Sequence, residues 1–361
     1  MPEGPRTRLA PDHFRALASA GLRAPIGTDL VLQEEPDPET ARLDSRRLAD
    51  VVRRAADRYR IPLAIPLMNL RLEKADIVRL VRPEVADPDT FHFDGPPSEA
   101  DLDRARDGGR AEFLAPQRAH VDAIAEVASR PGLIPIGMAI APFSLMTKLL
   151  RDPIAAVALA GRGVPAEEEP LVAAAERSLA LAELAVHRSV RGQLEAGAAA
   201  VMVCEPAASA VFVSPRQMAA GSLVFDRFVV EPLVRLRALL DGAGASLFLH
   251  DCGDATTAMV AALAGRVRPA VLSLGSSRRL WEDAAVVPPE VVLFGNVPTK
   301  HFYSDATMPI ERVRERTRDL VTRMRSAARP FVLGSECDVL HVPEAADRIR
   351  RKVEAMLTEA A

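Results

Sequence analysis

The stretch SLFLHDC, residues 246–252, joins a short apolar run to a polar cluster. An apolar run of this length is typical of a strand in a parallel sheet, because helices cover both faces of such a sheet. Since alternate residues of a strand point to the same face, His250 and Cys252 are expected to share a face while Asp251 points away. This one segment therefore predicts a buried parallel strand with a polar site at its carboxyl end.

Seven further runs of the same kind occur along the chain, and amphipathic helical stretches lie between most of them. The eight runs are IPLAIPLM (61–68), DTFHFD (89–94), LIPIGMAI (133–140), AAVMVCE (199–205), SLFLHDC (246–252), PAVLSLG (269–275), VVLFGNV (291–297) and FVLGSEC (331–337). Alternating strands and helices indicate βα units on a parallel sheet. Eight such units predict an α/β fold of the (β/α)8 barrel class, also called a TIM barrel.

The chain has 361 residues, a normal length for a single barrel of this class. Before the first predicted strand, residues 44–60 (DSRRLADVVRRAADRYR) show the spacing of an amphipathic helix rich in arginine. We therefore expect an N-terminal helical extension over residues 1–60 and a barrel catalytic domain over residues 61–361.

The composition excludes several classes of protein. The net charge is −3, and no basic stripe is present, so we do not expect nucleic-acid binding. The first residues, MPEGPRTRLAPDHF (1–14), lack the apolar core of a signal peptide, and no uncharged stretch reaches the roughly 20 residues that span a membrane. We therefore expect a cytoplasmic protein, not associated with membranes, whose three cysteines are reduced.

Distinctive polar residues collect at the carboxyl ends of the predicted strands, where a barrel of this class carries its active site. They are Asn69, Ser144, Glu205, His250, Cys252, Asn296 and Cys337. One imidazole and two thiolates form a plausible zinc site, and three protein ligands leave a fourth position open for chemistry. The simpler interpretation is that Cys252 and Cys337 are small apolar residues of the core, as most buried cysteines are.

The order and spacing of several segments resemble the uroporphyrinogen decarboxylase superfamily, and within it the zinc-dependent corrinoid:thiol methyltransferases of the methylcobalamin:coenzyme M type. The segments are MNLRLEKADI (68–77), IAPFSLMTKLL (140–150), GAAAVMVCEPAAS (197–209), FDRFVVEPL (225–233), LHDCG (249–253), LFGNV (293–297) and SECDV (335–339). That branch has a His-x-Cys element followed much later by a single cysteine as its zinc ligands. The resemblance therefore implies that His250, Cys252 and Cys337 bind Zn2+.

The resemblance also implies an enzyme, a zinc-dependent methyltransferase that moves a methyl group between a corrinoid and a small thiol held on zinc as the thiolate. No Asp-x-His-x-x-Gly signature of a corrinoid-binding domain is present. The corrinoid is thus expected to be free methylcobalamin or to be carried by a separate corrinoid protein. We expect Glu205 to act at the reaction centre, by binding a substrate amine or approaching the zinc. Asn69, Ser144 and Asn296 are expected to orient polar groups of the substrate.

The chain departs from the pattern of the superfamily at several positions. Decarboxylases have an aspartate that gathers pyrrole N–H groups where this chain has Asn69, and their N-terminal Arg-Gln-Ala-Gly-Arg-Tyr segment is missing. Pro298 replaces an aspartate, and Gly275-Ser276-Ser277 replaces acidic residues that methyltransferases often have. Uroporphyrinogen is therefore not expected as a substrate.

Two other functions remain open from the sequence: a metal-free lyase similar to uroporphyrinogen decarboxylase on the same barrel, and a non-catalytic accessory protein. The thiol, the methyl donor and the direction of transfer are open as well. Either Glu205 or water could be the fourth zinc ligand at rest.

Overall fold

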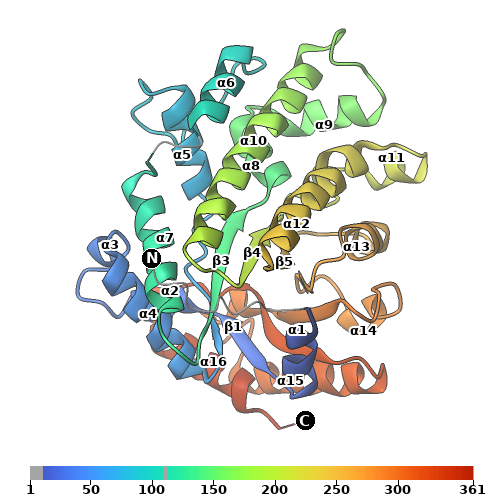
Figure 1. Cartoon of the computed structure of the whole chain (residues 1–361). Helices are drawn as coiled ribbons and strands as arrows, with labels where there is room; N and C mark the ends of the chain where they lie inside the picture. The colour runs from blue at the N-terminus through green and yellow to red at the C-terminus, as the bar shows by residue number, and fades with distance from the viewer. Residues whose placement is uncertain (1–10, 109–111, 361) are drawn as a thin grey trace.

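The structure is a computed structural model that describes residues 11–108 and 112–360, and it contains an eight-stranded parallel sheet rolled into a barrel (Figure 1). The strands are β1 (Arg23–Ile26), β2 (Leu63–Ala64), β3 (Ile134–Ile140), β4 (Ala200–Cys204), β5 (Ser246–Asp251), β6 (Val271–Leu274), β7 (Val292–Val297) and β8 (Phe331–Asp338). Their hydrogen-bonded order is β1-β8-β7-β6-β5-β4-β3-β2. The predicted (β/α)8 barrel is thereby confirmed.

The two edge strands, β1 and β2, are linked by a side chain. The hydroxyl group of Thr28, just after β1, donates a buried hydrogen bond of 2.6 Å to the carbonyl oxygen of Ile65, just after β2. A buried hydroxyl group that is paired in this way contributes to stability, whereas an unpaired one would cost free energy. The contact therefore joins the two edges of the curled sheet near their carboxyl ends.

Helices surround the sheet (Figure 1). They are α1 (Pro11–Ser19), α2 (Thr28–Leu32), α3 (Pro38–Ala41), α4 (Ser45–Tyr59), α5 (Leu72–Val81), α6 (Glu99–Asp107), α7 (Ala115–Ala128), α8 (Pro142–Leu149), α9 (Pro153–Gly161), α10 (Pro170–Glu195), α11 (Pro215–Ala219), η2 (Asp226–Val230), α12 (Glu231–Ala243), α13 (Thr257–Ala262), η3 (Leu263–Val267), α14 (Leu280–Asp283), η4 (Thr299–His301), α15 (Ile310–Ser326), η5 (Pro343–Ala345) and α16 (Ala346–Thr358). None of these helices is both long and apolar enough to cross a lipid bilayer.

One predicted strand is wrong. Residues 89–90 end a turn, residues 91–92 have no regular structure, and Phe93 makes only an isolated parallel bridge, with Leu150. The aromatic residues of this segment are followed by Gly95 and Pro96, and this composition favours a turn over a continued strand. The aromatic pair instead packs edge to face, with the ring centroids of Phe91 and Phe93 4.9 Å apart.

The strand that takes the place of the wrongly predicted one is β1. It lies within the segment 1–60, which we expected to be a helical extension. The described part of this segment does contain α1 to α4, but β1 pairs with β8 and belongs to the sheet. The register of this pairing shifts between Ala24 and Ile26. Pro25 lies at the shift, and proline cannot donate a ladder hydrogen bond, so it fits only where one side of the strand is free.

The interior of the barrel changes from apolar to polar toward the carboxyl ends of the strands. Phe248 of β5 contacts Phe294 of β7 and Phe14 of α1, with ring centroids 5.2 and 6.5 Å apart, respectively. All three side chains are buried. Two residues further along β5 lies His250, which pairs in register with Ser273 of β6. An apolar floor therefore underlies a buried polar site.

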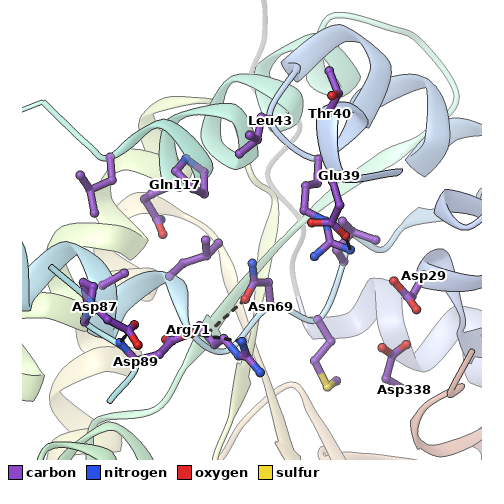
Figure 2. A pocket seen from close by; sticks show the side chains of 18 residues that line it. Asp29, Glu39, Thr40, Leu43, Asn69, Arg71, Asp87, Asp89, Gln117 and Asp338 are labelled. Carbon is purple, nitrogen blue, oxygen red and sulfur yellow. Dashed lines mark hydrogen bonds and ion pairs between the residues drawn. The ribbon is translucent and has the colours of Figure 1, made fainter. Parts of the chain in front are cut away.

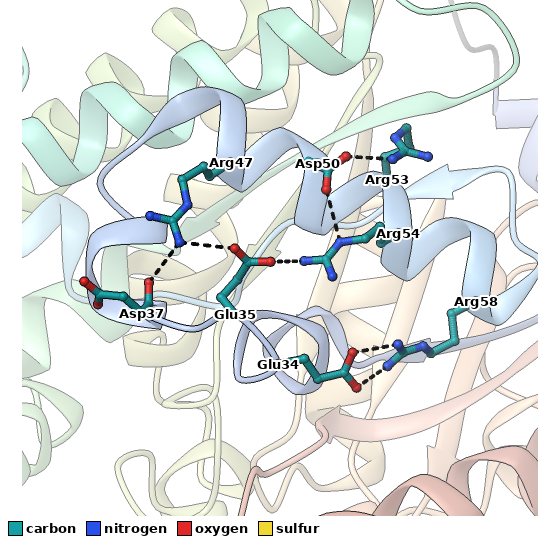
Figure 3. Close-up of polar contacts among 8 residues, drawn as sticks. All are labelled: Glu34, Glu35, Asp37, Arg47, Asp50, Arg53, Arg54 and Arg58. Carbon is teal, nitrogen blue, oxygen red and sulfur yellow. Dashed lines mark hydrogen bonds and ion pairs between the residues drawn. The ribbon is translucent and has the colours of Figure 1, made fainter.

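Ion pairs hold α4 against the segment that follows α2 (Figure 3). Glu35 pairs with Arg47 and Arg54, and Glu34 pairs with Arg58 at 2.6 Å. A single exposed ion pair contributes little, about 0 to 1 kcal/mol, but several that share partners restrain the segments that they join. The network thus fixes the position of α2, one wall of the cavity described below.

Candidate metal centre

His250, Cys252 and Cys337 come together at the carboxyl ends of β5 and β8. One ligand atom from each lies within 4.8 Å of the others, and the sulfur atoms of the two cysteines are 3.6 Å apart. His250 is buried, while the cysteines are partly exposed. Two strands separate β5 from β8 in the sheet, so the three residues meet across the barrel mouth.

The donor set fits a zinc ion. Two sulfur atoms at the usual Zn–S distance in a tetrahedral site are about 3.8 Å apart, close to the separation seen here. A disulfide would require about 2.05 Å, and both cysteines are free. Among the described residues, the buried Nε2 atom of His250 has no hydrogen-bond partner. Buried polar atoms rarely lack partners, and a nitrogen left free in this way is suited to bind a metal.

The other ring nitrogen of His250 is held by the barrel wall. Its Nδ1 atom lies 2.8 Å from the hydroxyl oxygen of Ser273 on β6. Residues that hold the second nitrogen of a metal-binding histidine fix the orientation of the ring. We did not identify Ser273 from the sequence, although it lies in the run LSL on the strand next to His250.

The two thiols influence one another. The hydrogen bond between the two cysteines lowers the pKa of Cys337, and His250 lowers it further. The same hydrogen bond, together with burial, raises the pKa of Cys252. Burial lowers the pKa of Lys300, but the charges of both cysteines and of nearby carboxylates outweigh this effect and raise it. The site therefore already stabilises one thiolate, with a cationic side chain close by.

Glu205 and Ser144 lie beside one another, away from the interior face that carries His250. The Ser144 hydroxyl group donates a hydrogen bond to Glu205 and accepts one of 3.0 Å from the amide of Ala207. Burial raises the pKa of Glu205 to about 8, although the hydrogen bond from Ser144 opposes this shift. Residues of adjacent strands that pair in register point the same way, and the register partner of His250 is Cys204. The interior neighbour of the histidine is thus Cys204.

Cys204 is fully buried in the core, and its sulfur lies 3.5 Å from that of Met138. It is not part of the group of metal-binding atoms formed by His250, Cys252 and Cys337. Burial raises its pKa well above the usual value, so it remains a neutral thiol.

Asn296 fixes a loop at the barrel mouth. Its amide nitrogen donates to the carbonyl oxygens of Gly275 and Arg278, at 2.8 and 2.9 Å. Glu336 of β8, which the sequence analysis missed, accepts hydrogen bonds from Ser276 and from the amide of Lys300. A carboxylate from β8 thus lies beside the Gly275-Ser276-Ser277 segment, where acidic residues were expected and are missing.

Asn69 lines a cavity of about 710 Å3 next to the metal centre (Figure 2). Its side-chain oxygen accepts a hydrogen bond of 3.3 Å from the amide of Arg71. The cavity reaches the metal centre at Met68, whose sulfur is 4.0 Å from that of Cys337, and at Asp338. The cavity is therefore placed to hold a small molecule whose reactive end lies at the three ligands.

Comparisons with known proteins agree with this architecture. A structure described as a methyltransferase from Methanosarcina mazei superposes with a TM-score of 0.66 over 95% of this chain and 97% of that chain, at 15% sequence identity. At this identity the likeness shows the fold. No curated protein sequence matches. The sequence model of the family described as Uroporphyrinogen decarboxylase (URO-D) matches residues 89–356, which is most of the chain. The protein therefore belongs to the uroporphyrinogen decarboxylase family.

Proposed function

We propose that this protein is a zinc-dependent methyltransferase that moves a methyl group between a corrinoid and a small thiol. The observation that carries the proposal is the convergence of His250, Cys252 and Cys337 at the barrel mouth, with a buried, unpartnered histidine nitrogen among them. The methyltransferase with the same fold supports this class of reaction. We place the protein in the cytoplasm, where its cysteines stay reduced.

The three side chains would hold the zinc ion. When bound, zinc lowers the pKa of a thiol in its open position and so keeps that thiol as the nucleophilic thiolate. Two thiolate ligands make such a site a weak Lewis acid toward water, which favours alkyl transfer over hydrolysis.

The surrounding residues prepare the substrates. Ser273 fixes the ring of His250, and the apolar floor formed by Phe248 and Phe294 excludes water from below. Lys300 provides a positive charge beside the cysteines. In the transfer from a methylated corrinoid, a carbon–sulfur bond forms, and the cobalt–carbon bond breaks with its electron pair left on cobalt. The protein contributes by holding sulfur and methyl group in line.

The corrinoid is a substrate in this proposal, supplied as free methylcobalamin or on a separate protein. Glu205, which we expected to act in the reaction, is directed toward Ser144. We therefore assign the positioning of the thiol to the cavity that contains Asn69.

The test uses the zinc-loaded protein, methylcobalamin and a panel of small thiols, and follows the visible spectrum of the cobalamin. Demethylation that depends on one class of thiol and is lost in Cys337→Ala is the expected result. A spectrum that does not change with any thiol, together with no methyl exchange with a corrinoid protein, would contradict the proposal. Activity that persists in Cys337→Ala would point instead to the metal-free lyase.

A further inference from the structure

The polar side chains that line the cavity beside the metal centre indicate which kind of ligand it binds. This inference rests on the proposed function. Residues from several segments line it, among them Asp29, Asn69, Gln117 and Asp338 (Figure 2). Oxygen atoms that accept hydrogen bonds predominate among these polar groups. A complementary ligand must therefore bring donors and positive charge.

The acidic residues of the cavity are not all neutralised by the protein. Glu39 pairs with Arg42 at 3.3 Å, and Asp89 pairs with Arg71 at 3.1 Å. Among the described residues, neither Asp29 nor Asp338 forms an ion pair with a basic side chain. These pairings leave a net negative charge on one wall of the cavity.

Asp29 and Asp338 face one another on that wall (Figure 2). The pairing of β1 with β8 places Ile26 opposite Asp338, and Asp29 follows three residues later in the first turn of α2. The side chain of Asp29 accepts a hydrogen bond of 3.3 Å from the amide nitrogen of Gln33. Burial, and after it the negative charge of Asp29, raises the pKa of Asp338 well above its usual value. A cation placed between the two carboxyl groups removes the repulsion between them.

Gln117 gives an independent sign of a ligand. Its side chain is 1% exposed and reaches from α7 into the cavity. The amide nitrogen donates a hydrogen bond of 2.9 Å to the hydroxyl oxygen of Ser189, but the amide oxygen has no partner among the described residues. A buried carbonyl oxygen without a donor costs free energy, so this unpartnered atom points to a molecule bound in the cavity.

We propose that the cavity binds a protonated primary amino group, so that the thiol substrate is a short aminothiol. The ammonium group lies against Asp29 and Asp338, and the sulfur reaches the open position beside Cys252 and Cys337. Asp338 and Met68 both line the cavity, and the sulfur of Met68 lies 4.0 Å from that of Cys337, so the proposed ligand needs only a short carbon chain between its amine and its sulfur. A thiol with a carboxylate or sulfonate in place of the amine would meet the unpaired acids and be repelled.

The experiment measures the binding of three small molecules to the zinc-loaded protein by calorimetry. They are 2-aminoethanethiol, 2-hydroxyethanethiol and n-propylamine, which separate the contributions of the amine and the sulfur. The variant is Asp29→Asn, which keeps the shape and removes the charge, with Asp29→Ala as a second variant. Asp103→Asn is the matched control, because Asp103 lies on exposed helix α6 outside the cavity.

We expect 2-aminoethanethiol to bind about tenfold more tightly than 2-hydroxyethanethiol, because a hydrogen bond between charged groups contributes more to binding than one between neutral groups. Both Asp29 variants should lose this preference with unchanged zinc content, while Asp103→Asn keeps it. Equal binding of the two thiols by the wild type, or a preference that survives in both Asp29 variants, would overturn the aminothiol assignment. If n-propylamine binds in an Asp29-dependent manner but no thiol binds, the amine site stands and the proposed methyltransferase function fails.

Discussion

The sulfur atoms of Cys252 and Cys337 lie 3.6 Å apart, although 85 residues separate them in the chain. Cys252 directly follows β5 and Cys337 lies on β8, and β6 and β7 stand between these strands in the sheet. The curvature of the rolled sheet brings these residues together. The fold thus brings the two thiols together, and His250 completes a group of three side chains that could hold a metal ion.

We expect about one zinc ion per chain in protein purified without added metal. Cys252→Ala and Cys337→Ala should each lower the zinc content to a small fraction of the wild-type value, because a ligand is lost. Cys204→Ala is the matched control, since Cys204 is a buried cysteine outside the group. Elemental analysis measures the zinc content. Full zinc occupancy in both ligand variants would show that Cys252 and Cys337 are not zinc ligands. The variants should stay folded, because the barrel has its own apolar core.

Ser273→Ala should weaken zinc binding by roughly 10- to 100-fold, the usual effect of removing a residue that orients a metal ligand. The physical reason is the 2.8 Å contact between Ser273 and Nδ1 of His250, which fixes the ring. Competition with a zinc chelator measures the change. Ser277→Ala, at an exposed position of the next loop, should leave the affinity unchanged. Equal affinities in wild type and Ser273→Ala would show that the hydroxyl group does not orient the ligand.

Glu73→Gln should stabilise the protein more at pH 8 than at pH 5. Burial raises the pKa of Glu73 to about 7, and the hydrogen bond from Ser189 only partly opposes it. In the unfolded chain this group ionises near 4.5, so between these pH values the unfolded state holds fewer protons. Stability therefore falls as the pH rises through that window, by up to about 3 kcal/mol, and levels off above it.

The glutamine variant lacks this titration but can keep the 2.8 Å hydrogen bond with Ser189. Denaturant unfolding at both pH values measures the difference, with the exposed Glu290→Gln as a control. A stability difference between Glu73→Gln and wild type that is the same at pH 5 and pH 8 would contradict the shifted pKa.

Uroporphyrinogen should not be decarboxylated. Asn69 cannot supply the anion that gathers pyrrole N–H groups, and the unpaired acids Asp29 and Asp338 would repel the carboxylates of this substrate. Incubation with uroporphyrinogen, followed by analysis for products with fewer carboxyl groups, tests this directly. Turnover of uroporphyrinogen at the rate of a dedicated decarboxylase would contradict this prediction and show that the protein is a decarboxylase.

Seven strands of the barrel were predictable, because each is a continuous apolar run. The first strand was not, since β1 has four residues and includes Arg23 and Pro25, which break the apolar pattern. The incorrectly predicted strand at 89–94 shows the opposite error. Its aromatic residues do pack, and Phe93 is buried, but the segment forms only an isolated bridge with Leu150. The local sequence therefore predicts strands that are buried along their whole length. It does not predict segments whose conformation depends on contacts with distant parts of the chain.

The convergence of His250, Cys252 and Cys337 could be predicted from the sequence, but the surroundings of these residues could not. The i, i+2 spacing of His250 and Cys252 fixes their common face whatever the rest of the chain does. Glu205 differs, because its direction depends on the register of β4 with β5, which the sequence does not reveal. The same holds for Ser273 and for the facing pair Asp29 and Asp338, whose contacts arise from pairing between strands far apart in sequence.

The most direct test of the account is X-ray absorption at the zinc edge, recorded before and after a small thiol is added. The resting spectrum should fit two sulfur ligands and one nitrogen ligand, supplied by Cys252, Cys337 and His250. Addition of the substrate thiol should add one sulfur at the zinc–thiolate distance of about 2.3 Å. A zinc environment that gains no sulfur with any thiol would contradict the proposed reaction, even if the three protein ligands are correct.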